Sequence, residues 1–147
     1  MLVHNECLEL NDAFRYGSRR SHNKKPEQAH HISQDAAFRD KIPTNEGLSV
    51  NLHGNIRTDV ASPHYNVHET LENFWSDYRY GGKYYGKKPT VGQYNRAAYD
   101  SLVNAGIGEK QAAHYIRQAY EQQRSYGLTN KSFVPRIPGP IHLPKQH

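Results

Sequence analysis

The alternation of apolar and polar residues is clearest in the middle of the chain. From Gly47 to Leu52 the two kinds alternate, and a period of two is typical of a strand with one buried face. The short segment Gln28–Ile32 is also predicted as a strand or the end of one. Between the two, Asp35–Lys41 is expected to form one or two helical turns that end before Pro43.

A longer helix is predicted after Ser62-Pro63. Serine is a preferred N-cap residue, and proline suits the first helical position because an N–H there has no intrahelical acceptor. The helix is expected to run to about Tyr78, before the break at Gly81-Gly82. Helical spacing places the following residues on one side of it: His64, Val67, His68, Leu71 and Trp75.

Two further helices are predicted, over about 91–105 and 109–126. Thr90 and Gln93 match a capping box at the start of the first, and Gly106 and Gly127 are suited to end them. The two helices are expected to form a hairpin. From Pro135 onward the chain is rich in proline, which favours an extended tail lying along the body of the protein.

The N-terminal residues show no sustained period, and we expect at most a short helix around Cys7–Phe14 followed by a basic linker. The order of the elements after the linker is strand, strand, helix, so the fold class is expected to be α+β with a small ββα core and additional C-terminal helices. The expected organisation is an N-terminal segment (1–25), the ββα core (26–80), the helical hairpin (81–128) and the tail (129–147).

Composition narrows the chemistry. The chain has a single cysteine, Cys7, which excludes an internal disulfide and a zinc site built from several cysteines. A transition metal would therefore need histidine and carboxylate ligands. No apolar run approaches the roughly 18 residues of a membrane span, and the N-terminus lacks the pattern of a signal peptide, so no membrane partner is expected.

The charge is unevenly distributed along the chain. Residues 76–147 hold 11 lysines and arginines against 4 acidic residues, whereas residues 1–75 hold 8 against 10. The basic half also contains Tyr78, Tyr80, Tyr84 and Tyr85 among its cations. Cations for phosphates and rings for base stacking suit a nucleic-acid partner, although a solvated basic face is the simpler alternative.

Histidines carry the most specific signal. His64 and His68 are four residues apart on the predicted helix, so both rings project from one face and can bind one metal ion. The alternative is a pair of histidines that covers the edge of the core.

His30 and His31 are adjacent, and neighbours on a strand point to opposite faces. Both can serve one site only if the strand ends or twists there; otherwise the pair is a feature of the surface.

Together these segments resemble the HNH/endonuclease VII superfamily, the His-Me finger or ββα-metal nucleases. The quartet Ala29-His30-His31-Ile32 matches the motif of AHH-type bacterial toxin nucleases. The stretch from Asn55-Ile56 through seven residues to His64-x-x-x-His68 is similar to DNase colicins. The resemblance covers about residues 27–78, roughly a third of the chain.

The resemblance implies a role for each histidine. His30, His64 and His68 would bind one divalent ion, either Zn²⁺ or Mg²⁺, and His31 would be the general base. The family holds this base with an asparagine carbonyl. Asn45 and Asn55 are the main choices here and Asn51 is a weaker one. Arg57 is the arginine we would test first for stabilising the transition state, whereas His53 is interpreted as a turn residue.

The implied function is metal-dependent cleavage of nucleic acid, with DNA favoured over RNA. The resemblance also implies a C-terminal toxin domain of a secreted bacterial effector, delivered into a target cell and neutralised by an acidic immunity protein; an ordinary cytoplasmic nuclease is equally compatible. Two rival functions are a non-catalytic nucleic-acid or zinc-binding module and a metal-independent ribonuclease. A metalloprotease is disfavoured because Tyr65 stands where its helical motif has glutamate.

Overall fold

The computed structural model describes residues 9–21 and 26–145 and has an α+β fold, as predicted. Its sheet has three antiparallel strands in the order β1-β3-β2, so β3 lies in the centre. The strands are β1 (Phe14–Arg15), β2 (Glu27–His31) and β3 (Leu48–His53). The helices are α1 (Asp35–Phe38), α2 (Pro63–Ser76), α3 (Val91–Asn104) and α4 (Glu109–Ser125), with a 3₁₀ turn at Thr44–Glu46.

Both predicted strands are confirmed to within one residue at each end. In β3 the side chains of Val50 and Leu52 are buried, as the alternation predicts, but Ser49 on the opposite face is buried as well, because β3 contacts both α2 and α4. The register pairs His30 with Val50 and His31 with Ser49. This pairing fixes the position of the histidine doublet relative to the central strand.

Helix α2 begins where the sequence indicated. The Ser62 side chain accepts a hydrogen bond from the Tyr65 N–H, and Pro63 is the first helical residue. Val67, Leu71 and Trp75 on its inner side are fully buried. The apolar face predicted from the spacing therefore packs into the core.

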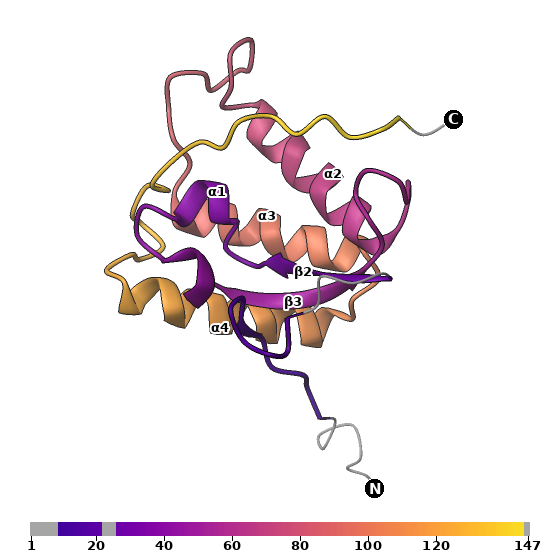
Figure 1. Ribbon diagram of the computed structural model, residues 1–147. Coiled ribbons are helices and arrows are strands. Elements are labelled where there is room, and N and C mark those ends of the chain that lie inside the picture. The colour runs from indigo at the N-terminus through magenta and orange to yellow at the C-terminus, as the bar shows by residue number, and fades with distance from the viewer. Residues whose placement is uncertain (1–8, 22–25, 146–147) are drawn as a thin grey trace, which may run out of the picture.

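Helices α3 and α4 also match the prediction. The Thr90 and Gln93 side chains form the expected capping box, and Gly106 and Gly127 follow the two helices with positive φ. The strands β2 and β3 lie between α2 and α4 (Figure 1), and α3 packs against both of these helices. One hydrophobic core contains side chains from the sheet, from α2 and from both C-terminal helices.

The N-terminal prediction was wrong for the residues that the structure describes. Residues 9–13 are not helical, and Phe14–Arg15 forms β1 at the free edge of β3; Cys7 lies outside the described residues. The N–H groups of Asn11 and Ala13 donate to the side-chain oxygens of Gln111 and Gln118 on α4, each at 2.8 Å. Long-range contacts thus satisfy the backbone groups that a helix would have paired locally.

The C-terminal tail, here residues 135–145, contains no helix or strand and runs along α2, as predicted (Figure 1). The Arg79 guanidinium donates to the carbonyls of Pro138 and Gly139, at 3.0 Å each. Further along, the Ile141 N–H donates to Glu72 and the Tyr65 hydroxyl donates to the Pro144 carbonyl. These hydrogen bonds hold the tail along α2, from the residues just after the helix back to its first turn.

Candidate metal centre

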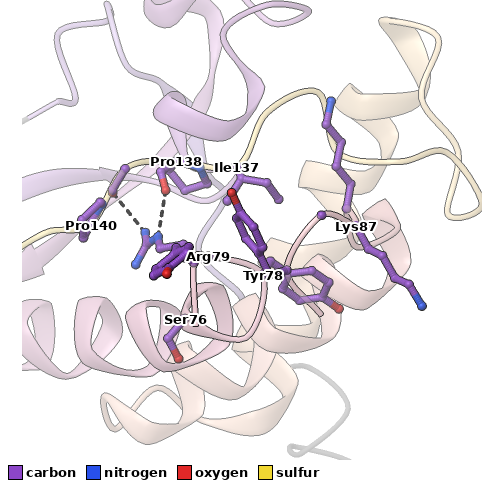
Figure 2. Close-up of a pocket in the computed structure, with 12 residues that line it drawn as sticks. Ser76, Tyr78, Arg79, Lys87, Ile137, Pro138 and Pro140 are labelled. Carbon is purple, nitrogen blue, oxygen red and sulfur yellow. Dashed lines mark hydrogen bonds between the residues drawn. The ribbon is translucent and has the colours of Figure 1, made fainter. Parts of the chain in front are cut away.

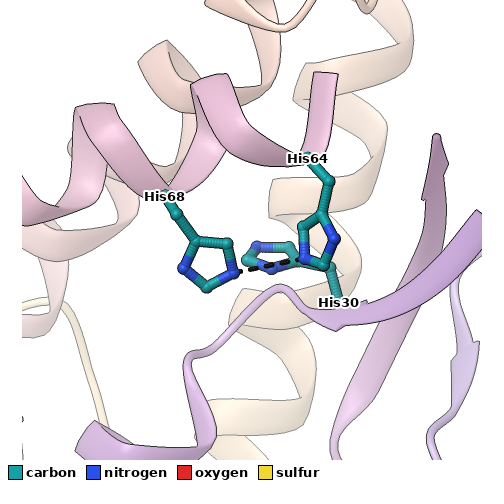
Figure 3. Close-up of side chains that lie close together, drawn as sticks. All are labelled: His30, His64 and His68. Atoms are coloured by element: carbon teal, nitrogen blue, oxygen red, sulfur yellow. Dashed lines mark hydrogen bonds between the residues drawn. The ribbon is translucent and has the colours of Figure 1, made fainter. Parts of the chain in front are cut away.

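Three histidine rings meet between the end of β2 and the first two turns of α2 (Figure 3). His30 projects from β2, and His64 and His68 project from the facing side of α2. One ring nitrogen of each lies within 4.8 Å of the corresponding nitrogens of the other two. The fold therefore brings His30 next to His64, 34 positions later in the chain, and to His68, so that three imidazole nitrogens face one point.

The chain turns away from the sheet directly after His31, which brings both members of the doublet to one cavity. The Tyr94 hydroxyl donates to the Ile32 carbonyl at 2.7 Å and accepts the Gln34 N–H at 2.9 Å. The Trp75 indole N–H donates to the Gln34 side chain. As a result, His30 and His31 both line a cavity of about 320 Å³, although they start on opposite faces of β2.

His64 is held in one tautomer by the turn that precedes α2. Its Nδ1 lies 3.2 Å from the Gly54 carbonyl oxygen, which can only accept, so Nδ1 carries the proton. Nε2 therefore carries the lone pair, and in the metal-free structure it can accept a hydrogen bond from Nε2 of His68, 3.2 Å away. Gly54 has φ +106°, and a Cβ there would lie 2.1 Å from the Ser62 hydroxyl oxygen, so this turn requires glycine.

The spacing of the histidines fits a metal ion. The Nε2 atoms of His64 and His68 are 3.2 Å apart. Two nitrogens bound to zinc at roughly 2.0–2.1 Å in a tetrahedral site would be roughly 3.3 Å apart. Nδ1 of His68, which is buried and has no hydrogen-bond partner among the described residues, lies on the side of the ring away from this cluster, so an ion held by Nε2 would leave it unpaired. The observation that suits an ion is therefore the convergence of three buried or partly buried imidazole nitrogens at this spacing.

The environment keeps these rings neutral. Burial, and then the nearby His68, His64 and His31, hold the pKa of His30 well below 6.5. Burial and the neighbouring His64 lower the pKa of His68 to about 4. Burial also lowers the pKa of His64, against the opposing effect of the Gly54 hydrogen bond. Only a neutral imidazole can bind a metal ion, so the cluster is in its ligating form at neutral pH.

His31 lies beside the cluster in a different setting. Its Nε2 is 2.9 Å from the Thr44 carbonyl oxygen, so Nε2 carries the proton and Nδ1 is the basic nitrogen. The ring stacks on Tyr16 with centroids 4.3 Å apart. A Cβ on Gly47 would lie 2.6 Å from Cδ2 of His31. Glycine is therefore needed at position 47 to let the ring reach Thr44.

The structure places the predicted supporting residues elsewhere. Asn45 is exposed, and its carbonyl accepts the Gly17 N–H. The Asn55 side chain accepts the Arg57 N–H within its own turn, at 2.8 Å, and the Asn51 amide donates to the Arg20 carbonyl. These three asparagines are not among the residues that line the histidine cavity.

Arg57 and His53 also lie outside the histidine cavity. Arg57 is exposed and lines a separate cavity together with Ile56 and Pro140–Leu143 of the tail. His53 is exposed at the end of β3. In the described structure it is the Thr44 main-chain carbonyl that holds His31, in the place where the resemblance implies an asparagine.

Sequence reasoning missed the groups that position His31. The Gln122 side chain accepts the Leu48 N–H at 3.0 Å and donates to the Glu46 carbonyl at 2.7 Å. It thereby holds the main chain on both sides of Gly47. A carbonyl has no side-chain signature, and Gln122 is 76 residues from Glu46. Gly47, directly before β3, is the residue whose type could have indicated that a side chain packs over the main chain there.

No protein-family model, curated protein or solved structure matched this chain. Among the helices of the described residues, none combines the length and apolar character needed to cross a membrane.

Proposed function

We propose that the protein is a metal-dependent endonuclease that hydrolyses phosphodiester bonds, with DNA as its substrate. The observation that supports this most directly is the convergence of His30, His64 and His68 beside a fourth histidine, His31, whose proton is placed on Nε2. A ligand set with an adjacent base is what metal-assisted hydrolysis requires.

The donor set favours Zn²⁺ over Mg²⁺. Three neutral imidazoles match catalytic zinc sites, which have three protein ligands and one open position. Mg²⁺ prefers oxygen ligands in octahedral geometry, and no carboxylate belongs to the cluster among the described residues. Other imidazole-binding ions such as Ni²⁺ and Co²⁺ would also be bound.

The bound ion would polarise the scissile phosphate and stabilise the leaving 3′-oxygen. His30, His64 and His68 would hold it. His31 would accept a proton at Nδ1 from the attacking water, whose oxygen forms the new bond to phosphorus as the bond to the 3′-oxygen breaks. The Thr44 carbonyl, which accepts the Nε2 proton, would stabilise the imidazolium that forms. Tyr16 would keep the ring in place by stacking.

The test is cleavage of plasmid DNA and of total RNA with Zn²⁺, Mn²⁺, Mg²⁺ or EDTA. The wild type is compared with His31→Ala and with His53→Ala, which removes an exposed histidine outside the cavity. We expect EDTA to abolish cleavage and His31→Ala to lower its rate by about 10²–10⁴-fold, the usual contribution of a general base. His53→Ala should cleave like the wild type.

Metal binding is measured in parallel, by calorimetric titration of Zn²⁺ into each protein. His31→Ala should bind Zn²⁺ with the wild-type affinity, whereas His68→Ala should lose it. Zinc binding without cleavage of either nucleic acid would favour a non-catalytic module. Cleavage of RNA that survives EDTA would favour a metal-independent ribonuclease. Either result would overturn the proposal.

We also propose, on the resemblance of the Ala29–Ile32 quartet, that this is the toxin domain of a secreted bacterial effector with an acidic immunity protein. The excess of 11 basic over 4 acidic residues in 76–147 supports an acidic partner.

A further inference from the structure

A second cavity, of about 800 Å³, lies where the loop after α2 meets the tail (Figure 2). We call residues 78–88 the tyrosine–lysine loop. Tyrosines and lysines of this loop form one wall, and Ile137–Pro140 of the tail form the other. Arg79, near the start of this loop, points to the tail and joins the two walls through its hydrogen bonds to the carbonyls of Pro138 and Gly139.

Tyr80 and Tyr85 are the most exposed rings of the tyrosine–lysine loop. Tyr80 is 90% exposed and Tyr85 is 62% exposed, values far above those of core aromatic residues. The two meet edge to face, with centroids 5.6 Å apart. Tyr84 is less exposed, at 42%, and its ring is covered in part by Tyr78 and by the Lys83 ammonium, which lies 5.2 Å from its centroid. Tyr80 and Tyr85 are therefore the rings of this loop that present exposed faces to a planar ligand.

The same cavity is bordered by cations. Lys87 and Lys88 line it, and both are exposed. The Lys88 ammonium donates to the Pro135 carbonyl at 2.9 Å, which leaves its charge without a carboxylate partner in the described structure. Arg79 is neutralised by Glu72 at 2.8 Å and serves to hold the tail. A ligand with flat apolar groups and negative charges complements this combination of rings and lysines.

Residues of the tail link this cavity to the candidate metal centre, because they border neighbouring cavities in turn. Pro140 borders this cavity and the one next to Arg57, and Ile141 borders the latter and the histidine cavity. His68 and Ser76, which line the two end cavities, are eight residues apart on α2. At 1.5 Å per residue this is roughly 12 Å. A single strand of DNA covers this span with only a few nucleotides, since even in a duplex each nucleotide advances a strand by roughly 3.4 Å.

We propose that the tyrosine–lysine loop binds an unpaired stretch of DNA flanking the cleavage site, with bases stacked on Tyr80 and Tyr85 and phosphates near Lys87 and Lys88. This proposal rests on the proposed nuclease function. Stacking on a protein ring requires an exposed base face, and in a duplex both faces are covered by neighbouring base pairs. The loop therefore selects single-stranded DNA, or duplex DNA with frayed or unpaired bases, as the substrate class.

The test measures binding separately from cleavage. His31→Ala protein in EDTA, which should not cleave, is titrated into fluorescent 12-nucleotide single-stranded DNA, its duplex and its RNA equivalent, and anisotropy is recorded. The same titrations are then made with His31→Ala protein that also carries both Tyr80→Ala and Tyr85→Ala. Tyr80→Phe/Tyr85→Phe keeps the stacking surface. Tyr120→Ala is the control, because Tyr120 lines a different tyrosine- and arginine-containing cavity between α3 and α4.

We expect single-stranded DNA to bind more tightly than duplex, and the double alanine variant to lose about tenfold or more in affinity, as expected for lost base stacking. The phenylalanine variant should bind like the parent, and Tyr120→Ala should change affinity less than twofold. Unchanged binding by the double alanine variant would overturn the proposal, as would equal loss with Tyr120→Ala. Tighter binding of duplex or of RNA, or dimerisation through the loop seen by light scattering, would also overturn it.

Cleavage and binding assays together distinguish failure of the nuclease proposal from failure of the loop proposal. If the wild type cleaves nothing but single-stranded DNA binding depends on Tyr80 and Tyr85, the loop proposal stands and the nuclease proposal falls. If the wild type cleaves and the alanine variant cleaves single-stranded and duplex DNA at unchanged relative rates, the reverse holds.

Discussion

Gly47 is a single residue on which the orientation of His31 depends. Its φ of −59° is open to any amino acid, so its backbone conformation does not require glycine. The requirement is space, because the His31 ring passes over position 47 on its way to the Thr44 carbonyl. Because Gly47 has no Cβ, the His31 ring has room to reach the Thr44 carbonyl.

Gly47→Ser should displace the His31 ring and lower the cleavage rate by about tenfold or more, since small misplacements of a catalytic group are costly. On the proposed function, zinc affinity should stay at the wild-type value, because His30, His64 and His68 are not touched. The rate and the affinity are measured by plasmid cleavage and zinc titration. Gly108→Ser is the control: a Cβ on Gly108 meets no heavy atom within 4 Å, and serine is a preferred N-cap residue. Equal rates for both variants would contradict this account of Gly47.

At the scale of elements, α2 has two functions. Its inner face packs Val67, Leu71 and Trp75 into the core, while its first two turns present His64 and His68. The start of the helix therefore affects both stability and the candidate site. Helix α3 has a comparable N-cap, Thr90, but bears none of the three clustered histidines.

This difference predicts separate effects for two matched substitutions. Ser62→Ala and Thr90→Ala should each lower the free energy of unfolding by about 1 kcal/mol, the usual cost of losing a side-chain N-cap. Only Ser62→Ala should also weaken zinc binding, by several-fold, because fraying there moves His64. Urea unfolding in EDTA and competitive zinc titration give the two quantities. Equal zinc affinities in the two variants would argue against coupling between the cap and the site.

At the scale of the whole molecule, the fold keeps three uncharged histidines between the sheet and α2. In the unfolded chain each has an ordinary pKa near 6.5, whereas burial lowers the folded pKa of all three and that of His68 to about 4. As pH falls below 6.5 the unfolded chain takes up protons that the metal-free folded protein cannot. The contribution of these three histidines to the free energy of unfolding is therefore fully present above pH 6.5, and it is lost as the pH falls toward 4.

The metal-free protein should lose about 3 kcal/mol of stability between pH 7 and pH 4 from His68 alone, since each pKa unit corresponds to about 1.4 kcal/mol. His30 and His64 change stability in the same direction. The measurement is urea unfolding in EDTA at several pH values. His68→Gln should make the profile less steep, because it removes one of the three groups with a lowered pKa and leaves His30 and His64. A wild-type stability that is constant from pH 7 to pH 5 would contradict the prediction.

The elements were predictable where their signals are local. Ser62-Pro63 and the Thr90–Gln93 capping box mark helix starts through neighbouring backbone groups, and the alternation at Gly47–Leu52 marks β3. The prediction for residues 9–14 was wrong because β1 exists only through contacts with β3 and α4. A two-residue strand is too short to have a period.

The sequence by itself determined the α+β order of elements and the pairing of His64 with His68, because helical spacing alone places them on one face. Only the tertiary structure decided that His30 joins them, since this depends on the register of β2 and on the turn held by Tyr94 and Trp75. It also decided that the Thr44 carbonyl contacts His31, because a backbone group carries no residue identity from which its partner can be inferred.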